Sequence, residues 1–290
     1  MADELAPGDQ ATVLAGEKAS FQTVSRLREQ LGLNRAWPIR YGEFVTKAAR
    51  FDFGNSYYGT KEPVNKVIAK NLPMTMTIAF LAISLAALIG ITLGTLSGSN
   101  ENKPQDRAIL ILSTLGVTIP TFVLSPIFVI IFTQNLDLLP GQWKTTRVAP
   151  DIFYLIMPIL VLAARPTAQI TRLCRASIIE ALQQEYTKLA VAKGVSRARL
   201  IFKHALRNAI LPVTTSIGSN FGILLTGSFI VEQAFLLPGI GREAIEAIQK
   251  GDTPLIQATT LLAGAMFVLV NLAVDLIVPW LDPRVREAQV

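Results

Sequence analysis

The stretch NLPMTMTIAFLAISLAALIGITLGTLSGSN, residues 71–100, contains no charged side chain. A helix needs about 20 predominantly apolar residues to cross the hydrocarbon core of a bilayer, so this stretch is long enough to span a membrane. Three further stretches are also free of charge, at 108–136, 208–231 and 253–274. Several such stretches in one chain predict a polytopic membrane protein.

The composition agrees with this prediction. Of the 290 residues, 51% are hydrophobic and only 17% are charged, and the mean hydropathy is +0.43. We expect an all-α membrane helix bundle (residues 72–281) with five transmembrane helices; Arg165 interrupts the apolar run of the third. The expected spans are 72–98, 108–134, 152–176, 209–231 and 255–280.

Proline residues fall inside two of these spans. Pro120 and Pro126 lie in the second span, and Pro158 and Pro166 lie in the third. Each proline removes a backbone hydrogen bond and is expected to bend its helix.

The N-terminal residues and the single cysteine exclude several features. MADELAPGDQ starts with acidic residues and no apolar core follows, so it is not a signal peptide. Cys174 is alone, which excludes an internal disulfide and a cysteine metal cluster.

The distribution of basic residues predicts the orientation. Residues 172–207 carry eight Lys/Arg and two Glu, a net charge of +6 that equals the charge of the whole chain. Short basic loops stay in the cytoplasm, so the loop at 177–208 is predicted to be cytoplasmic, as is the tail at 282–290. Alternation along the spans then places residues 1–71 outside the cell.

That N-terminal segment carries ten Lys/Arg and no hydrophobic run to take it across the membrane. We therefore expect a first transmembrane helix upstream of Leu5, which would bring the number of spans to six. Within the segment, residues 20–34 are expected to form a surface helix capped by Ser20.

The cytoplasmic loop reads EYTKLAVAKGVSRARLIFKHALRNAILP at residues 185–212. Gly194 can take the left-handed conformation that ends a helix, and Ser196 can cap the next one. This second helix is amphipathic and basic, with Ile201 and Phe202 on its apolar side. Such a helix could lie on anionic lipid headgroups or dock on a protein partner.

The span at 208–231 mixes small and polar residues, which predicts that it is buried among other helices. Its polar side chains could serve packing or could line a solute pathway. The candidates for a pathway are Ser216, Ser219, Asn220 and Thr226.

Several motifs carry a resemblance to a known family. The loop has Glu185-Tyr186, an Ala-Lys-Gly step ending at Gly194, and a His-Ala-Leu-Arg-Asn-Ala helix beginning at His204. It resembles the EAA loop of membrane permease subunits in the oligopeptide, dipeptide and nickel family of ABC importers. Further resemblances are LAPGD (5–9), FDFGNS (51–56), PGIGR (238–242) and LDPRVR (281–286).

The resemblance implies a transport subunit of the cytoplasmic membrane, driven by ATPase partners that engage residues 185–207. It implies a second homologous permease subunit, two ATP-binding-cassette subunits that bind ATP and magnesium, an extracytoplasmic solute-binding protein, surrounding lipid and no nucleic acid. The family's first transmembrane helix directly precedes LAPGD, which again points to a helix upstream. The expected coupling residues are Glu185, Tyr186, Leu189, Ala190, Lys193, Gly194, Ser196, Ile201, Phe202 and His204.

The chain itself is not expected to be an enzyme or to bind a cofactor or metal. It has no G-x-x-x-x-G-K-[ST] nucleotide loop and no H-E-x-x-H zinc motif. The substrate stays open among dipeptides, oligopeptides, glutathione and nickel chelates. An ion-driven secondary transporter is a distant alternative, because it would need paired carboxylates inside the membrane.

Overall fold

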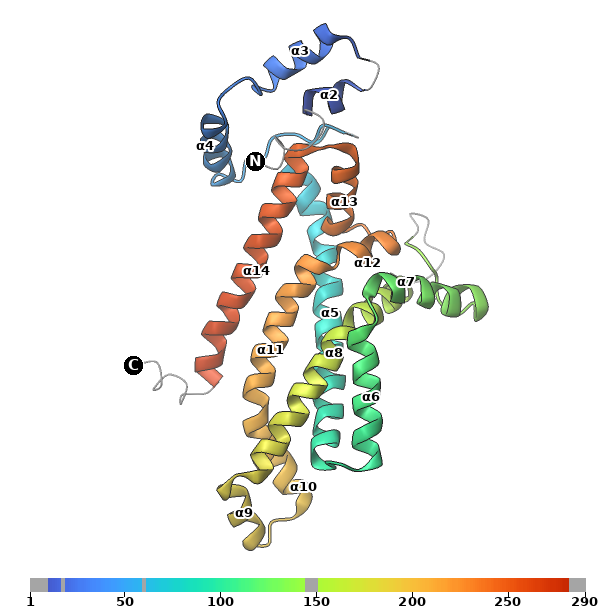
Figure 1. The fold of residues 1–290 in the computed structure, drawn as a ribbon, viewed down its shortest axis with the longest axis vertical. Helices are drawn as coiled ribbons and strands as arrows, with labels where there is room; N and C mark the ends of the chain where they lie inside the picture. Colours follow the sequence, from blue (N-terminus) through green and yellow to red (C-terminus); the bar gives the residue numbers. More distant parts are fainter. Residues whose placement is uncertain (1–9, 17–18, 59–60, 144–150, 282–290) are drawn as a thin grey trace. The chain divides into compact units, whose positions relative to one another are not determined.

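The computed structural model describes residues 10–16, 19–58, 61–143 and 151–281. Within these ranges the regular structure is helical, and the only β-type pairing is an isolated bridge between Asn55 and Pro63 (Figure 1). The all-α prediction is confirmed. The expected tail at 282–290, the LAPGD motif and all of LDPRVR except Leu281 lie outside the described residues.

The chain forms two compact units. The first unit contains Met1–Met74 and Pro238–Ala263, and the second contains Thr75–Leu237 and Gly264–Val290. Helices α5 (Val64–Ser99) and α14 (Thr253–Leu281) each contribute to both units.

In the first unit the N-terminal segment folds into short helices. These are α2 (Gln10–Ala15), α3 (Phe21–Gln30) and α4 (Trp37–Ala48). The Ser20 hydroxyl accepts a hydrogen bond from the Thr23 backbone N–H at 3.3 Å, so the predicted cap of α3 is confirmed. The unit also contains α13 (Ile240–Lys250), which ends where Gly251 takes a left-handed conformation.

The FDFGNS motif packs onto the start of α14. The Ser56 hydroxyl donates to Asp252 Oδ2 at 2.5 Å, and the Tyr57 backbone N–H donates to the same oxygen at 3.1 Å. Asp252 precedes α14 and also accepts from Leu255 N–H, at 3.4 Å. Asp252 therefore caps the start of α14 and also holds the motif, which is far away in the sequence.

The second unit is built around α8 (Asp151–Gln183), which packs against α6, α7, α11 and α12. Two π-helices, η1 and η2, directly follow α7 and α10. The bounds of these elements are α6 Pro104–Thr118, α7 Thr121–Phe128, η1 Val129–Asn135, α9 Glu185–Ala192, α10 Arg197–Arg199, η2 Leu200–Ala205, α11 Leu206–Gly227 and α12 Phe229–Ala234.

A row of glycines brings α5 into direct contact with α8. Gly90, Gly94 and Gly98 are spaced four residues apart and therefore share one face of α5. A Cβ added at Gly94 would lie 2.5 Å from Cys174 Cβ and 2.7 Å from the Thr171 carbonyl oxygen. Only glycine permits this approach, as in the close helix pairs of other membrane proteins. This contact was not among the features predicted from the sequence.

Four helices in the described part of the chain are long and apolar enough to span a membrane. A fifth span results if α6 is counted together with α7 and η1, which meet it at an angle of 101°. The bend falls at Pro120, as predicted, because Ile119 is extended with φ −81° and ψ 119°. By contrast, α8 continues as one helix through both Pro158 and Pro166.

Candidate functional site: the loop between α8 and α11

The predicted coupling loop contains one short separate helix, α9 (Glu185–Ala192). Gly194 ends this helix with φ +76°, and the Gly194 and Val195 N–H groups bond back to the Val191 and Ala190 carbonyls at 2.9 and 3.1 Å. The predicted stop at Gly194 is therefore confirmed.

The second predicted helix of the loop is not separate. After Ser196, α10, η2 and α11 follow without a break, so the helical run extends from Arg197 to Gly227. Ser196 takes the N-cap position but its hydroxyl makes no capping hydrogen bond. The amphipathic segment predicted to lie in the loop is thus the first part of a candidate membrane span.

Two hydrogen bonds hold α9 against the neighbouring helices. Thr187 is buried and its hydroxyl donates to the Ala181 carbonyl in α8 at 2.7 Å. On the other side, Asn208 of α11 donates to the Tyr186 hydroxyl at 2.7 Å. The short helix is therefore fixed to both helices that flank it.

A third contact links the loop to the end of α5. Arg197 Nη2 donates to the Ser99 carbonyl at 2.6 Å. Ser99 is the last residue of α5, whose orphan carbonyls attract a basic side chain. The loop is thus bonded to α5, α8 and α11.

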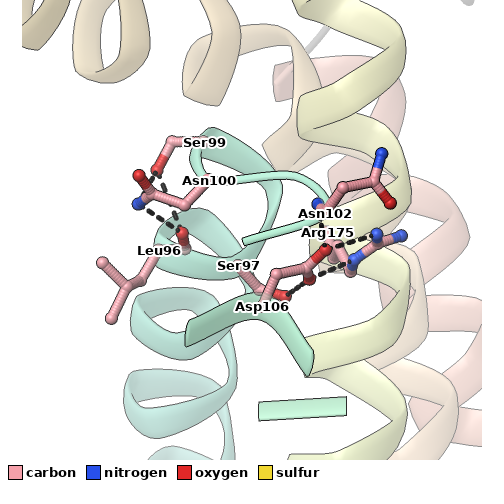
Figure 2. A network of polar contacts seen from close by, with 7 residues as sticks. All are labelled: Leu96, Ser97, Ser99, Asn100, Asn102, Asp106 and Arg175. Carbon is pink, nitrogen blue, oxygen red and sulfur yellow. Dashed lines mark hydrogen bonds and ion pairs between the residues drawn. The ribbon is translucent and has the colours of Figure 1, made fainter. Parts of the chain in front are cut away.

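The same end of α5 is braced by a buried ion pair (Figure 2). Arg175 of α8 binds both oxygens of Asp106 at the start of α6, with N–O distances of 2.6 and 2.8 Å. Asp106 also accepts from the Ser97 hydroxyl at 2.5 Å and from the Asn102 N–H at 2.9 Å. One carboxylate therefore joins α5, α6 and α8 at this end of the unit.

The outer surface of the loop is apolar at four places. Leu189 is 62% exposed and Phe202 is 66% exposed, and Tyr186 and Val191 are also exposed. Ile201, expected beside Phe202 as an apolar anchor, is half-buried instead. Large exposed apolar side chains on one segment are typical of a protein or lipid interaction site.

The other candidate residues of the loop lie at its surface or support it. Glu185 and Lys188 form an exposed ion pair at 2.7 Å, which contributes little to stability. Ala190 lies on the buried side of α9, Lys193 takes the C-cap position before Gly194, and His204 is half-buried. No described group of three or more His, Cys, Asp or Glu residues is arranged to bind a metal.

The candidate pathway residues lie on α11, and Asn220 and Thr226 make hydrogen bonds within this helix. Asn220 is buried and donates to the Ser216 carbonyl at 2.8 Å, while Thr226 donates to the Ile223 carbonyl at 3.1 Å. Ser219 is half-buried. On the same helix, a Cβ at Gly218 would collide with Val274 of α14. These contacts favour the packing interpretation of this helix, and a pathway role stays a prediction.

Sequence reasoning missed four residues that position or extend the loop: Thr187, Val191, Arg197 and Asn208. Thr187 had a usable signal, because a lone hydroxyl on the apolar side of a short helix suggests a buried hydrogen bond. The partners of Arg197 and Asn208 lie far away in the sequence, so no local pattern indicates them.

Comparison with known proteins identifies the family. A family model described as a binding-protein-dependent transport system inner membrane component matches residues 88–287, which is more than half of the chain. The chain belongs to this family. It is a membrane-spanning permease subunit of an ABC transport system and a multi-pass protein of the inner membrane.

Relatives of this permease match it over nearly its whole length. A probable peptide ABC transporter permease protein of Sinorhizobium fredii is 36% identical over 285 residues, covering 97% of this chain and 91% of the relative. A putative peptide transport system permease protein of Brucella abortus is 35% identical, with 98% and 91% covered. A glutathione transport system permease protein of Salmonella choleraesuis is 34% identical, with 97% and 90% covered.

A solved structure supports the fold of the permease. The crystal structure of an amino acid ABC transporter with histidines superposes with a TM-score of 0.55 at 18% sequence identity. The match covers 76% of this chain and 94% of the other. At this identity the similarity establishes the fold alone.

Proposed function

We propose that this permease moves peptides, or small peptide-like solutes such as glutathione, across the cytoplasmic membrane. The proposal is supported by the names of its relatives, which include peptide and glutathione permeases at 34–36% identity over nearly the whole chain. Glutathione is itself a tripeptide, so both kinds of relative indicate one class of substrate.

The proposal includes three kinds of partner. These are a second homologous permease subunit, two ATP-binding-cassette ATPase subunits and an extracytoplasmic solute-binding protein. ATP and magnesium would be bound by the ATPase subunits, because the sequence of this chain contains no phosphate-binding loop. The chain would act as a transport subunit without catalytic residues of its own.

The observation that carries the coupling part of the proposal is the exposed apolar surface of a firmly held loop. Leu189, Val191 and Phe202 are each more than half exposed. Apolar anchors that fill pockets of a partner supply most of the binding energy in protein interfaces. We assign these three side chains, with Tyr186, to contact with an ATPase subunit.

The contacts within the loop indicate how a displacement would reach the membrane. A movement of α9 would act on α8 through Thr187 and on α11 through Tyr186, while Arg197 would carry it to α5. Short polar contacts of this kind transmit a displacement without a large change in the loop itself. The ATPase would thus move several spans together.

If the same surface faces lipid instead, aspartate substitutions there should leave ATPase binding intact. The two roles can therefore be separated. The test uses the full transporter assembled in nanodiscs, with Leu189→Asp and Phe202→Asp variants of this chain. We expect both variants to lose co-purification with the ATPase subunits and to lose peptide uptake. Phe21→Asp is the matched control, because Phe21 is 88% exposed and lies in the N-terminal segment.

Retention of ATPase binding and uptake by both loop variants would refute the coupling assignment. The substrate is tested separately, by uptake of labelled dipeptides, longer peptides and glutathione into vesicles containing the wild-type transporter. ATP-dependent uptake of none of these solutes would refute the substrate assignment and leave the coupling assignment intact.

A further inference from the structure

Helix α4 (Trp37–Ala48) carries most of its apolar side chains on one face, with exposed Ile39 off that face, and none of its residues is buried. Trp37, Tyr41, Phe44, Val45 and Ala48 are spaced by three and four residues, so they share one face of the helix. We call this set the aromatic face of α4. A face of this kind, left exposed, needs an apolar neighbour outside the folded unit.

The chemistry of the aromatic face matches a boundary between water and lipid. Trp37 is 53% exposed and Tyr41 is 59% exposed, and their rings lie next to each other with centroids 6.2 Å apart. Trp and Tyr combine an apolar ring with a polar group, and they are enriched where membranes meet water.

The charge of the segment is complementary to phospholipid. Residues 35–50 contain four Lys/Arg and one acidic residue, Glu43. Glu43 forms an ion pair with Arg35 at 2.6 Å. Lys47 and Arg50 are exposed, and the segment keeps a net positive charge that suits lipid phosphates.

Within the first unit, α4 lies beside the start of a helix that is able to span a membrane. The aromatic face borders an open hollow of about 640 Å³ whose other wall includes the first turns of α14, and α14 is one of the helices able to span a membrane. Because α14 begins at Thr253, we expect this span to leave the apolar core of the bilayer near this level of the unit. The lining residues that show this are Trp37, Tyr41, Phe44, Thr253, Pro254 and Gln257.

We propose that α4 is an interfacial helix, and that its aromatic face lies in the headgroup layer of the leaflet at which α14 begins. Trp37, Tyr41 and Val45 then contact lipid, and Lys47 faces the phosphates and water. The N-terminal segment is in this way held to the membrane surface beside α14 by an amphipathic helix. The inference does not depend on the coupling loop or on the substrate.

Site-directed spin labelling tests this placement in the assembled transporter in nanodiscs. Cys174 is the sole cysteine of this chain and is fully buried, so the chain itself adds no background label, and the partner subunits are used in cysteine-free form. A nitroxide is attached at Tyr41→Cys on the aromatic face and, as the matched control, at Lys47→Cys on the polar face. Collision rates are measured with oxygen, which concentrates in lipid, and with a water-soluble nickel chelate.

We expect the ratio of oxygen to nickel collisions to be several-fold higher at position 41 than at position 47. Equal ratios at the two positions, with both labels open to the nickel chelate, would show that α4 lies in water and would overturn the proposal. Protection of position 41 from both reagents would show that a protein covers the face, and this would overturn it equally. Retained uptake by both labelled variants shows that the labels have not unfolded the chain.

Discussion

Arg175 donates two parallel hydrogen bonds to Asp106, from Nε to Oδ1 at 2.6 Å and from Nη2 to Oδ2 at 2.8 Å. The Asp106 side chain is only 2% exposed, and the Arg175 side chain is 21% exposed. Removing one member of a buried pair leaves the other charge without compensation, which costs far more than losing a surface ion pair.

We therefore expect Asp106→Asn to destabilise the permease by about 3 kcal/mol, the magnitude usual for a broken buried ion pair. Arg175→Lys should also destabilise it, because an ammonium cannot make the parallel contacts of a guanidinium. Thermal unfolding of the purified transporter measures both effects. Arg172→Lys, at an exposed position of the same helix, is the control and should unfold as the wild type does.

The close contact at the glycines of α5 leads to a second prediction. Gly94→Ala should destabilise the permease by about 3 kcal/mol, because its methyl group would overlap Cys174 and the Thr171 backbone and the helices would have to separate. Gly264→Ala in α14 is the matched control, since a Cβ there meets nothing within 4 Å. Equal unfolding temperatures for the two variants would contradict the close contact of α5 with α8.

Substitutions at Gly194 test the conformation of the coupling loop rather than its packing. A Cβ at Gly194 meets no atom within 4 Å, but φ +76° is unfavourable for a branched residue by roughly 1–2 kcal/mol. Gly194→Val should therefore leave the chain inserted in the membrane and abolish substrate-stimulated ATP hydrolysis. Gly194→Asn, which tolerates positive φ better, should retain part of it. An unchanged ATPase rate in the valine variant would refute the coupling role of the loop.

The contact between the FDFGNS motif and Asp252 predicts a change in a tyrosine titration. Burial, and secondarily the negative charge of Asp252, raise the pKa of Tyr57 above its ordinary value of 10.0. The folded state thus favours the neutral phenol, so this contribution to stability is present below pH 10 and is lost as the pH rises through the raised pKa. Asp252→Asn should lower the pKa of Tyr57 only partly, because burial remains.

The Tyr57 titration is followed by phenolate absorbance, as the difference between each protein and its Tyr57→Phe variant. Asp52→Asn is the control, because Asp52 lies near the same turn but is not a cause of the raised Tyr57 pKa. A Tyr57 pKa that is the same in the Asp252→Asn protein and the wild type would show that the carboxylate does not act on the phenol.

Features set by local sequence were predicted well. The cap at Ser20 and the stop at Gly194 depend on one or two residues and their immediate neighbours, and both are confirmed. The apolar runs also predicted helices able to span the membrane, although α5 begins earlier than expected, at Val64. The polar residues of Val64–Lys70 obscured this start, because they reduce hydropathy without breaking the helix.

Features set by distant contacts were not predicted. The same local rule applies to Pro120 and Pro158, yet the chain breaks at the first and stays helical at the second. Met157 and Ile159 beside Pro158 are buried, and packing on several sides can hold a helix whose backbone has lost one hydrogen bond. Likewise, nothing near Asp106 in the sequence indicates that its partner is Arg175.

The unbroken helical run from Arg197 to Gly227 makes the end of the coupling loop and a membrane span parts of one rod. A helix of 31 residues is about 46 Å long at its ordinary rise, so a tilt of about 5° moves one end by about 4 Å relative to the other. A lever of this length amplifies small angular changes into displacements larger than an atom. The end of the loop and the span therefore tilt together.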